Sequence, residues 1–400
     1  MDGHSQRLLT YGRQCIDESD ERAILEVLRS PWLTQGPYVE RFERALIERF
    51  GAQYAVVCAN GTAALHLAAL ALGWQPGDVI IVPAITFVAS ANCAVYVGAE
   101  PHFVDIDPRT LAIDPALAEK AVIELRAAGR RVRAIVGVDM AGHPADWLAL
   151  RAIADRHELQ LVDDACHALG ASYQNGARRI GDGVDADVTI LSFHPVKHIT
   201  TGEGGAILTN DPRLADRLAL LRSHGIRRGA TQVESWEGPW HLDMTELGLN
   251  YRLSDLQCAL GLSQLAKLDN FLARRRAIVA EYAAAFAGDP TFSLPSTAPG
   301  TNPAWHLHVL RARFSQPHGR RRFFAACLER GIQLQVHYRP VPRNTFYRKR
   351  LPADVMSRLP HSDRYYDECF SIPMYPQLTS EDIAHVVRTL RDVYADEASR

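Results

Sequence analysis

The stretch that decides the fold runs from Leu191 to Asn210 and reads LSFHPVKHITTGEGGAILTN. It places one lysine, Lys197, between an apolar segment and a run of Thr, Gly and Glu that leads into a second apolar segment. Short apolar runs bounded by Gly and Pro are typical of buried strands. Most lysines are solvated surface amines and need no such frame. A lysine that attacks a carbonyl to form a Schiff base needs a partly dry site, and this segment predicts one.

Around this stretch, from about residue 50 to 210, short strand-like runs alternate with longer helix-like runs. The strand-like runs read YAVVCA, DVIIVPA, RAIVGVD, LQLVDD, ADVTILSF and GGAILTN, and the helix-like runs between them include TAALHLAALAL, FVASANCAVYV and WLALRAIADRH. This alternation implies crossover connections and a mostly parallel sheet covered on both faces. Because ligands of such sheets bind at the carboxyl ends of the strands, we expect the chemistry at that edge.

The C-terminal third predicts a smaller unit. Ser254 and Gln257 form a capping box before a helical pattern that runs to about Phe286. A segment rich in Pro, Gly, Ser and Thr follows, then a strand (HLHVLRARF), a helix (RRRFFAACLERG) and a final helix from Glu381. We expect residues 1–265 to form an N-terminal segment with a large domain, and residues 266–400 to form a linking helix with a small domain.

Composition excludes several classes of protein. The 400 residues are 47% hydrophobic, which is enough for a large core, and 44 Lys and Arg balance 46 Asp and Glu. No global charge therefore attracts nucleic acid or an anionic membrane.

The seven cysteines are scattered and never form C-x-x-C, so we expect no disulfide framework, no metal site and a cytoplasmic location. The uncharged window Val79–Ala99 is interrupted by Pro83 and is expected to be a buried strand followed by a buried helix.

Three further strand-end features accompany the lysine. A strand breaks at Gly61 and a helix begins near Thr62, where free N–H groups can bind an anion. Asp164 ends the run LQLVDD and could hold a protonated pyridine nitrogen, while His167 could reach a neighbouring ring oxygen. Phe87 follows another strand and could lie flat on a planar cofactor. Taken singly, these residues are equally well an ordinary N-cap, a helix-capping carboxylate and a core phenylalanine.

Together the four features match the needs of pyridoxal phosphate (PLP). This cofactor needs a phosphate seat, a partner for the pyridine nitrogen, a stacking ring and a reactive lysine. Competing motifs are absent from the sequence, which has no G-x-G-x-x-G opening a helix, no Walker loop and no H-E-x-x-H. The four features together therefore favour a PLP enzyme over an enzyme that binds nicotinamide or ATP and over a zinc protease.

At this point the chain resembles the sugar aminotransferases of the DegT/DnrJ/EryC1/StrS family. The resemblance covers nearly the whole chain and rests on YGRQCIDESD, PWLTQGPYVERFE, GTAALHLAALALG, VDDACHALG, SFHPVKHITTGEGG, GLNYRLSDLQCALG, VHYRPVP and SIPMYPQLTSED. It implies an α/β fold, the aspartate-aminotransferase-like fold type I of PLP enzymes, with a mostly parallel central sheet and a smaller C-terminal α/β domain. The lysine segment is most similar to the branch that makes UDP-4-amino-4,6-dideoxy-N-acetyl-β-L-altrosamine, on the route to pseudaminic acid.

The resemblance also implies roles for individual residues. Lys197 would bond to the cofactor and shuttle the proton, Asp164 would pair with the ring nitrogen, and His167 would contact the ring hydroxyl side. The remaining cofactor contacts would be Gly61, Thr62 and Ser192 at the phosphate, Phe87 on the ring, and Asn250 at the phosphate of the other subunit of a homodimer. The nucleotide-sugar pocket would be lined by Tyr11, Leu33, Thr34, Gln35, Gly36, Val336, His337, Tyr338 and Arg339.

The implied reaction moves an amino group from L-glutamate to C4 of a nucleotide-linked 4-keto-6-deoxyhexose. The branch resemblance implies UDP-2-acetamido-2,6-dideoxy-β-L-arabino-hex-4-ulose. Alternatives are another UDP-, dTDP- or GDP-linked ketosugar of the bacillosamine, perosamine or 4-amino-arabinose type, and a non-catalytic nucleotide-sugar binder. Relatives that deoxygenate sugars carry histidine where Lys197 stands. The chain departs from the family pattern at Asp163, where glutamate is commoner. It also carries two added charges, Arg339 and Arg343, which either meet the substrate diphosphate or are solvated. Glu203 has no assigned role.

Overall fold

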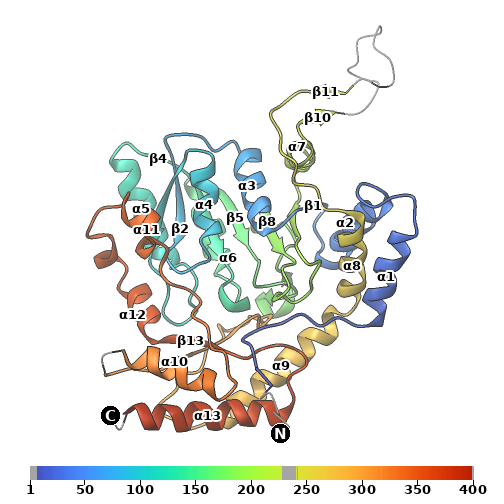
Figure 1. Cartoon of the computed structure of the whole chain (residues 1–400). Helices are drawn as coiled ribbons and strands as arrows, with labels where there is room; N and C mark the ends of the chain where they lie inside the picture. The colour runs from blue at the N-terminus through green and yellow to red at the C-terminus, as the bar shows by residue number, and fades with distance from the viewer. Residues whose placement is uncertain (1–6, 228–239, 241, 317, 399–400) are drawn as a thin grey trace.

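A mixed sheet of seven strands forms the centre of the protein (Figure 1). The computed structural model describes residues 7–227, 240, 242–316 and 318–398. The strands of the sheet are β1 (Tyr54–Cys58), β2 (Asp78–Pro83), β3 (Glu100–Val104), β4 (Arg131–Val138), β5 (Gln160–Asp164), β8 (Val188–Ser192) and β9 (Gly205–Thr209). Their order is β1-β9-β8-β5-β4-β2-β3, and β9 runs antiparallel to both of its neighbours while the other pairs are parallel. The predicted mostly parallel α/β sheet is confirmed.

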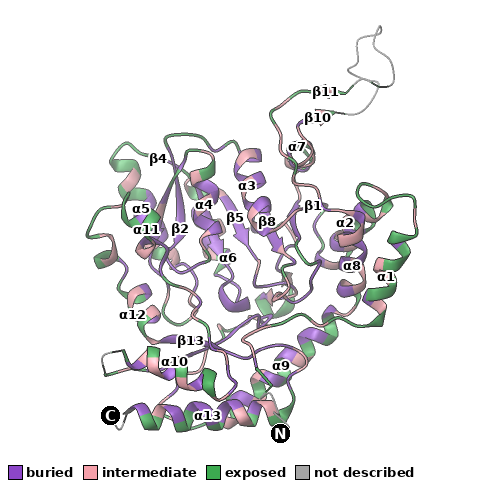
Figure 2. Ribbon diagram, viewed as in Figure 1, coloured by how far each residue is buried: buried purple, intermediate pink, exposed green. Residues whose placement is uncertain are grey.

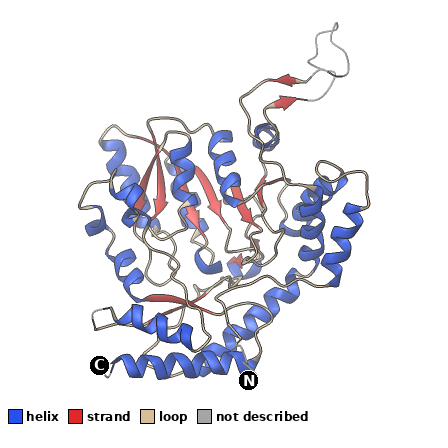
Figure 3. Cartoon of the chain, in the orientation of Figure 1, coloured by secondary structure: helices blue, strands red, loops and turns tan. Residues whose placement is uncertain are grey.

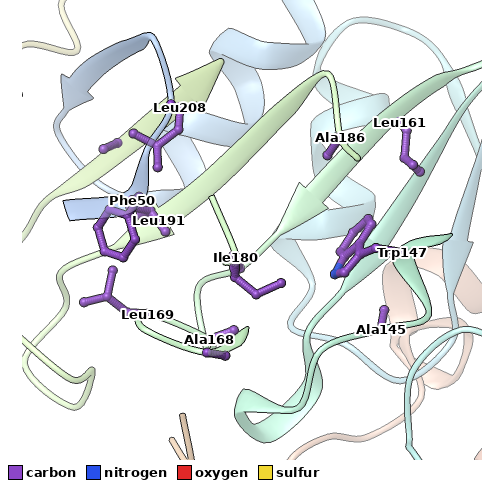
Figure 4. Close-up of a cluster of buried hydrophobic side chains, with 14 of the residues drawn as sticks. Phe50, Ala145, Trp147, Leu161, Ala168, Leu169, Ile180, Ala186, Leu191 and Leu208 are labelled. Carbon is purple, nitrogen blue, oxygen red and sulfur yellow. The ribbon is translucent and has the colours of Figure 1, made fainter. Parts of the chain in front are cut away.

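Helices cover both faces of this sheet, as Figure 3 shows. Two hydrophobic cores result. The first core includes residues of α2 (Pro37–Phe50), α5 (Pro115–Ala127), α6 (Trp147–Arg156) and α8 (Asp255–Ala266), and the second includes residues of α3 (Gly61–Ala71), α4 (Ala89–Tyr96) and α7 (Pro212–Arg222). Neighbouring residues of a strand enter opposite cores because strand side chains alternate. Leu161 lies in the first core and Val162 in the second. Figure 4 shows part of the first core, around Trp147 and Phe50. Burial on both faces explains why the strands read as unbroken apolar runs.

The long helix predicted from Ser254 to Phe286 was wrong in one respect. The capping box of Ser254 and Gln257 is present, but the helix divides at Lys267 into α8 and α9 (Leu268–Ala285). The ammonium of Lys267 lies 2.6 Å from an Asp20 carboxylate oxygen and 2.9 Å from one of Asp17, at the start of α1 (Glu18–Leu28). Its backbone stays near helical values, with φ −96° and ψ −3°, so the apolar periodicity continues across the division and gave no signal of it.

The C-terminal part of the chain contains β12 (His308–Arg311), α10 (Gly319–Glu329), α11 (Thr345–Arg348), α12 (Pro360–Glu368), β13 (Cys369–Ile372) and α13 (Ser380–Ala398). Tyr347 of α11 belongs to the core of α3, α4 and α7, and Tyr365 of α12 belongs to another small cluster, but most of these elements pack around a separate core. Residues of α9, α10, β13 and α13 share this core with Leu9, whose carbonyl accepts from Gln333 N and whose N–H donates to the Gly331 carbonyl. The domain boundary at 265/266 stays a prediction. Within the described parts of the chain, no helix has the length and apolar character needed to cross a membrane.

A two-stranded arm projects from the body beyond α7 (Figure 1). It contains β10 (Ile226–Arg227) and β11 (Asp243–Met244), which pair antiparallel. Large apolar side chains are exposed along it, including Trp240 at 78% and Leu247 at 85%, in the region coloured largely as exposed or intermediate in Figure 2. The short elements of the rest of the chain are β6 (Ser172–Tyr173), β7 (Arg178–Arg179) and the 3-10 turns η1 (Met140–Gly142), η2 (Gln174–Gly176), η3 (Val341–Arg343) and η4 (Val355–Arg358).

Candidate active site

A cavity of about 550 Å³ lies where the parallel strands end. The segments that follow β1, β2, β5 and β8 form one wall, and residues 335–338 of the C-terminal unit form the opposite wall. Eleven of the residues predicted for the site line it: Tyr11, Gly61, Thr62, Phe87, Asp164, His167, Ser192, Lys197, Val336, His337 and Tyr338. The topology explains this gathering, because parallel strands bring the residues that follow them to the same edge.

One end of the cavity is suited to an anion. Helix α3 begins at Gly61, and the Asn60 side chain caps it by accepting from Ala63 N at 2.8 Å. By helix geometry, the N–H groups of Gly61 and Thr62 have no partner within the helix. A Cβ at Gly61 would lie 3.1 Å from the Ser192 Cβ and 3.2 Å from the Cys166 Sγ, so glycine lets the helix start approach β8 closely. Backbone N–H groups, the positive helix end and the hydroxyls of Thr62 and Ser192 suit an anion, and a phosphate at this turn stays a prediction.

Asp164 ends β5 and is buried against hydroxyl groups. One carboxylate oxygen accepts from Ser90 Oγ at 2.6 Å, and Ser90 Oγ lies 2.7 Å from Thr86 Oγ1. The other carboxylate oxygen accepts from the N–H of Cys166 at 3.3 Å. These hydrogen bonds fix the orientation of the carboxyl group at the end of β5. Sequence reasoning missed Thr86 and Ser90, although two hydroxyl residues four positions apart at the start of α4 were a usable signal.

His167 is buried with both ring nitrogens engaged. Its Nδ1 lies 3.3 Å from the N–H nitrogen of Ala141, and its Nε2 lies 3.1 Å from the Tyr338 hydroxyl. Its ring centroid is 4.4 Å from that of His306, which also lines the cavity and was not predicted. Burial, helped by the charge of Lys197, holds the pKa of His167 well below its ordinary value, so the imidazole is neutral. A contact with a ring hydroxyl stays a prediction.

Lys197 lies on the loop that joins β8 to β9. The loop is closed at its base, because Phe193 N donates to the Gly204 carbonyl at 2.8 Å and Thr201 N donates to the Phe193 carbonyl at 3.0 Å. The Lys197 N–H donates to the His194 carbonyl at 2.8 Å. Burial lowers the pKa of the Lys197 amine from its ordinary value, while Cys166 and Asp164 act in the opposite direction. An amine with a lowered pKa is more often in the neutral, nucleophilic form.

Behind the cavity, two buried carboxyl groups meet between β4 and β5. Asp139 accepts from Ala145 N at 2.8 Å and from Trp147 Nε1 at 2.9 Å through one oxygen, and Asp163 accepts from Thr189 Oγ1 at 3.2 Å. The second oxygen of each aspartate has no hydrogen-bond partner among the described residues. Burial raises the pKa of Asp139 to about 7 and that of Asp163 well above its ordinary value. Both carboxyl groups therefore keep their protons to a higher pH than exposed aspartates do.

Other predicted residues lie outside this single-chain cavity. The segment 33–36 lies at the N-terminus of α8, where Gly36 N donates to Asp255 and the Gln35 amide donates to the Leu253 carbonyl. Asn250 accepts from Arg252 Nε at 3.1 Å. The side chain of Arg339 is not among the residues that line the cavity, so the structure does not bring it to the wall with its three predecessors. The nucleotide-sugar and partner-subunit roles of these residues stay predictions.

The two residues without a settled role are placed by the structure as follows. Arg343 pairs with Asp363, and its guanidinium lies 5.1 Å from the centroid of the Tyr366 ring. Glu203 lines the cavity, and its backbone carbonyl accepts from Thr201 Oγ1 and from the Gln257 amide, both at 2.7 Å. The Glu203 backbone therefore fixes the lysine loop to α8.

Known proteins resemble this chain along nearly its full length. The model of the DegT/DnrJ/EryC1/StrS aminotransferase family matches residues 14–391. The UDP-4-amino-4,6-dideoxy-N-acetyl-beta-L-altrosamine transaminase of Campylobacter jejuni is 38% identical over 384 residues, which cover 96% of each chain.

Two solved structures share the fold. Helicobacter pylori PseC, an aminotransferase involved in the biosynthesis of pseudoaminic acid, has a TM-score of 0.86 and 30% identity, covering 98% of this chain and 100% of PseC. Spr1654 from Streptococcus pneumoniae, in its PLP form, has a TM-score of 0.87 and 27% identity, covering 96% of this chain and 98% of that one.

Proposed function

Because this chain belongs to the DegT/DnrJ/EryC1/StrS aminotransferase family, it is a PLP-dependent sugar aminotransferase, and we propose its substrates. The amino donor is L-glutamate, and the acceptor is C4 of a nucleotide-linked 4-keto-6-deoxyhexose. The sugar is UDP-2-acetamido-2,6-dideoxy-β-L-arabino-hex-4-ulose. The observation that carries this proposal is the meeting of Lys197, Asp164 and the anion seat at Gly61 in one cavity.

The residues of the cavity fit PLP. Gly61, Thr62 and Ser192 would hold the phosphate, and Asp164 would pair with the ring nitrogen. Phe87, half exposed on the cavity wall, would cover one face of the ring. When bound, PLP supplies a carbon that combines with amines and a ring that takes up electrons.

The chain's own groups then move the protons and position the substrates. Lys197 Nζ accepts the proton from Cα of L-glutamate and later delivers one to C4 of the hexose. Its lowered pKa suits an amine that must both accept and release a proton near neutral pH. Asp164 is held in place by Ser90 Oγ and the Cys166 N–H, so its carboxyl group is positioned to pair with the ring nitrogen. Donor and acceptor use one cavity in turn, which predicts ping-pong kinetics.

The complete site requires a homodimer in this proposal. Asn250 and the segment 33–36 lie outside the cavity of their own chain, although the family resemblance assigns them to the cofactor phosphate and the sugar pocket. Exposed apolar side chains on the arm, such as Trp240 and Leu247, provide a surface that a second copy could cover. The predicted cytoplasmic location is part of the same proposal and rests on composition alone.

The choice of sugar is supported by two similar proteins. The Campylobacter relative is named as the altrosamine transaminase, and PseC is described as acting in pseudoaminic acid biosynthesis. The alternatives are aminotransferases for another UDP-, dTDP- or GDP-linked ketosugar. The presence of both Lys197 and Asp164 in the cavity argues against a non-catalytic binder.

An end-point assay tests the proposal. The protein is incubated with L-glutamate and a panel of UDP-, dTDP- and GDP-4-keto-6-deoxyhexoses, and 2-oxoglutarate and the mass of the nucleotide product are measured. We expect amino sugar from the UDP-N-acetyl β-L-arabino ketone and none with Lys197→Ala. Preference for another ketosugar would contradict the sugar assignment. Failure of all ketosugars, with a bound chromophore that borohydride abolishes, would contradict the substrate class.

A further inference from the structure

A strained backbone residue sits beside the buried His167. Ala141 has φ 58° and ψ 8°, in the left-handed region that residues other than glycine seldom adopt. The C-terminal unit holds this turn: Leu307 N donates to the Ala141 carbonyl at 3.3 Å, and Ala304 N donates to the Gly142 carbonyl at 2.9 Å. The result is that the Ala141 N–H points at Nδ1 of His167. Strained backbone of this kind is often found at functional sites, where the surrounding structure imposes it.

This contact decides where the proton of His167 lies. A backbone N–H can only donate, so Nδ1 of His167 must be the acceptor and carries no proton. The neutral imidazole therefore carries its proton on Nε2. Nε2 lies 3.1 Å from the Tyr338 oxygen, so Nε2–H donates and the tyrosine oxygen accepts.

The hydroxyl proton of Tyr338 is consequently directed away from His167. Among the described residues, His167 is the single hydrogen-bond partner that the structure gives to this hydroxyl. Tyr338 lies on the wall of residues 335–338, and its ring centroid is 5.9 Å from that of Phe87 on the opposite wall. Burial raises the pKa of Tyr338 above its ordinary value, so the hydroxyl keeps its proton. The cavity thus contains an oriented O–H donor to which the described residues offer no acceptor.

We propose that Tyr338 donates this hydrogen bond to the C4 carbonyl oxygen of the bound ketosugar, and that the Ala141 N–H and His167 orient it. The proposal rests on the proposed function. Residues 335–338 line the cavity but are not among the residues predicted to hold the cofactor, so a donor there is available to the acceptor sugar. The C4 oxygen is the atom that amination replaces with nitrogen, so this contact distinguishes the keto substrate from the amino product.

The network fixes a donor and does not form a proton wire. His167 cannot pass its Nε2 proton to Tyr338 and take another at Nδ1, because the Ala141 N–H occupies Nδ1. Tyr338 therefore polarises the carbonyl and positions C4, while proton transfer stays with Lys197. This division of roles separates the effects expected from variants of the two residues.

Binding measurements in a form that cannot turn over test the proposal. Lys197→Ala loaded with PLP, alone and combined with Tyr338→Phe, is titrated by calorimetry with the ketosugar nucleotide and with UDP. Loss of a hydrogen bond to a carbonyl should weaken ketosugar binding about tenfold. Affinity for UDP should stay the same, which also shows that the variant is folded. Tyr54→Phe is the matched control, because it makes the same chemical change at a tyrosine that does not line the cavity.

Each outcome has a separate meaning. A selective loss of ketosugar affinity in Tyr338→Phe, absent in Tyr54→Phe, supports the proposal. Equal ketosugar affinity with and without the hydroxyl overturns it and leaves the proposed function intact. Binding of UDP but of no ketosugar in the panel overturns both. One more result would overturn the sugar contact. If ketosugar affinity is unchanged, and if the pH titration of the cofactor absorbance band shifts in Tyr338→Phe with Lys197 present, then the hydroxyl donates to a cofactor oxygen instead.

Discussion

Replacing Asp139 by asparagine should remove a pH dependence of stability that its buried carboxyl group creates. The ordinary pKa of 3.8 rises in the folded protein to about 7, mainly by burial. An acid that holds its proton more tightly in the folded state stabilises that state fully at low pH. This contribution is lost as the pH rises from the unfolded value to the folded value, because the unfolded chain ionises first.

The expected size follows from these two values. At about 1.4 kcal/mol for each pKa unit, the wild-type protein should lose about 2 to 3 kcal/mol of unfolding free energy between pH 5 and pH 8 through this group alone. The asparagine side chain of Asp139→Asn cannot ionise. Its amide oxygen can still accept from Ala145 N and Trp147 Nε1, and its NH₂ group can donate to Asp163. The variant should therefore gain stability relative to wild type as the pH rises.

Urea unfolding followed by tryptophan fluorescence at pH 5, 6, 7 and 8, in constant excess PLP, measures this difference. Asp155→Asn is the matched control, because it makes the same chemical change at an exposed carboxylate beside Arg151. The difference between Asp139→Asn and wild type should increase by about 2 to 3 kcal/mol, while the control difference stays nearly flat. Parallel pH profiles for wild type and Asp139→Asn would refute the raised pKa of Asp139.

Three further outcomes follow from the site. Ser90→Ala removes the donor 2.6 Å from Asp164 and should weaken PLP binding about tenfold in an absorbance titration; unchanged affinity would show that Ser90 does not support the carboxylate. Gly61→Ala puts a Cβ 3.1 Å from its nearest neighbour and should also weaken PLP binding, and equal affinity would argue against a phosphate at this turn. Mixed dimers of Lys197→Ala and Asn250→Ala chains should recover about a quarter of wild-type activity if the subunits share sites. Half of the dimers are then mixed, and each of these holds one intact site of two. Zero recovery would contradict shared sites.

The fold was largely predictable because its strands are long apolar runs. β1, β2, β4, β5, β8 and β9 coincide with the six strand-like runs of the sequence, and burial on both faces gives each a strong signal. The division at Lys267 was not predictable, because the backbone of Lys267 stays near helical values, and its contacts with Asp17 and Asp20 join residues about 250 positions apart. Local periodicity carries no information about such distant ion pairs.

The candidate site likewise has a part that the sequence predicts and a part that it does not. Gly61, Asp164 and Lys197 follow apolar strands, so sequence position alone places them at one edge of a parallel sheet. The contacts of Ser90 with Asp164 and of Tyr338 with His167 join residues 74 and 171 positions apart, and they exist only through packing. The substitution of aspartate at 163 looked chemically neutral from the sequence. The structure shows that its partner is a second carboxyl group, which changes the local protonation.

The strand order β1-β9-β8 has a consequence for how the protein is made. The phosphate seat after β1 is complete only when Tyr54–Cys58 has paired with Gly205–Thr209, about 150 residues later in synthesis. The cavity wall at 335–338 emerges later still, and Tyr11 receives its backbone partner, the Met374 N–H, only near the end of translation. A nascent chain on the ribosome therefore has no finished pocket. Cofactor loading should be a late event, and chains truncated before residue 374 should be made but should remain colourless.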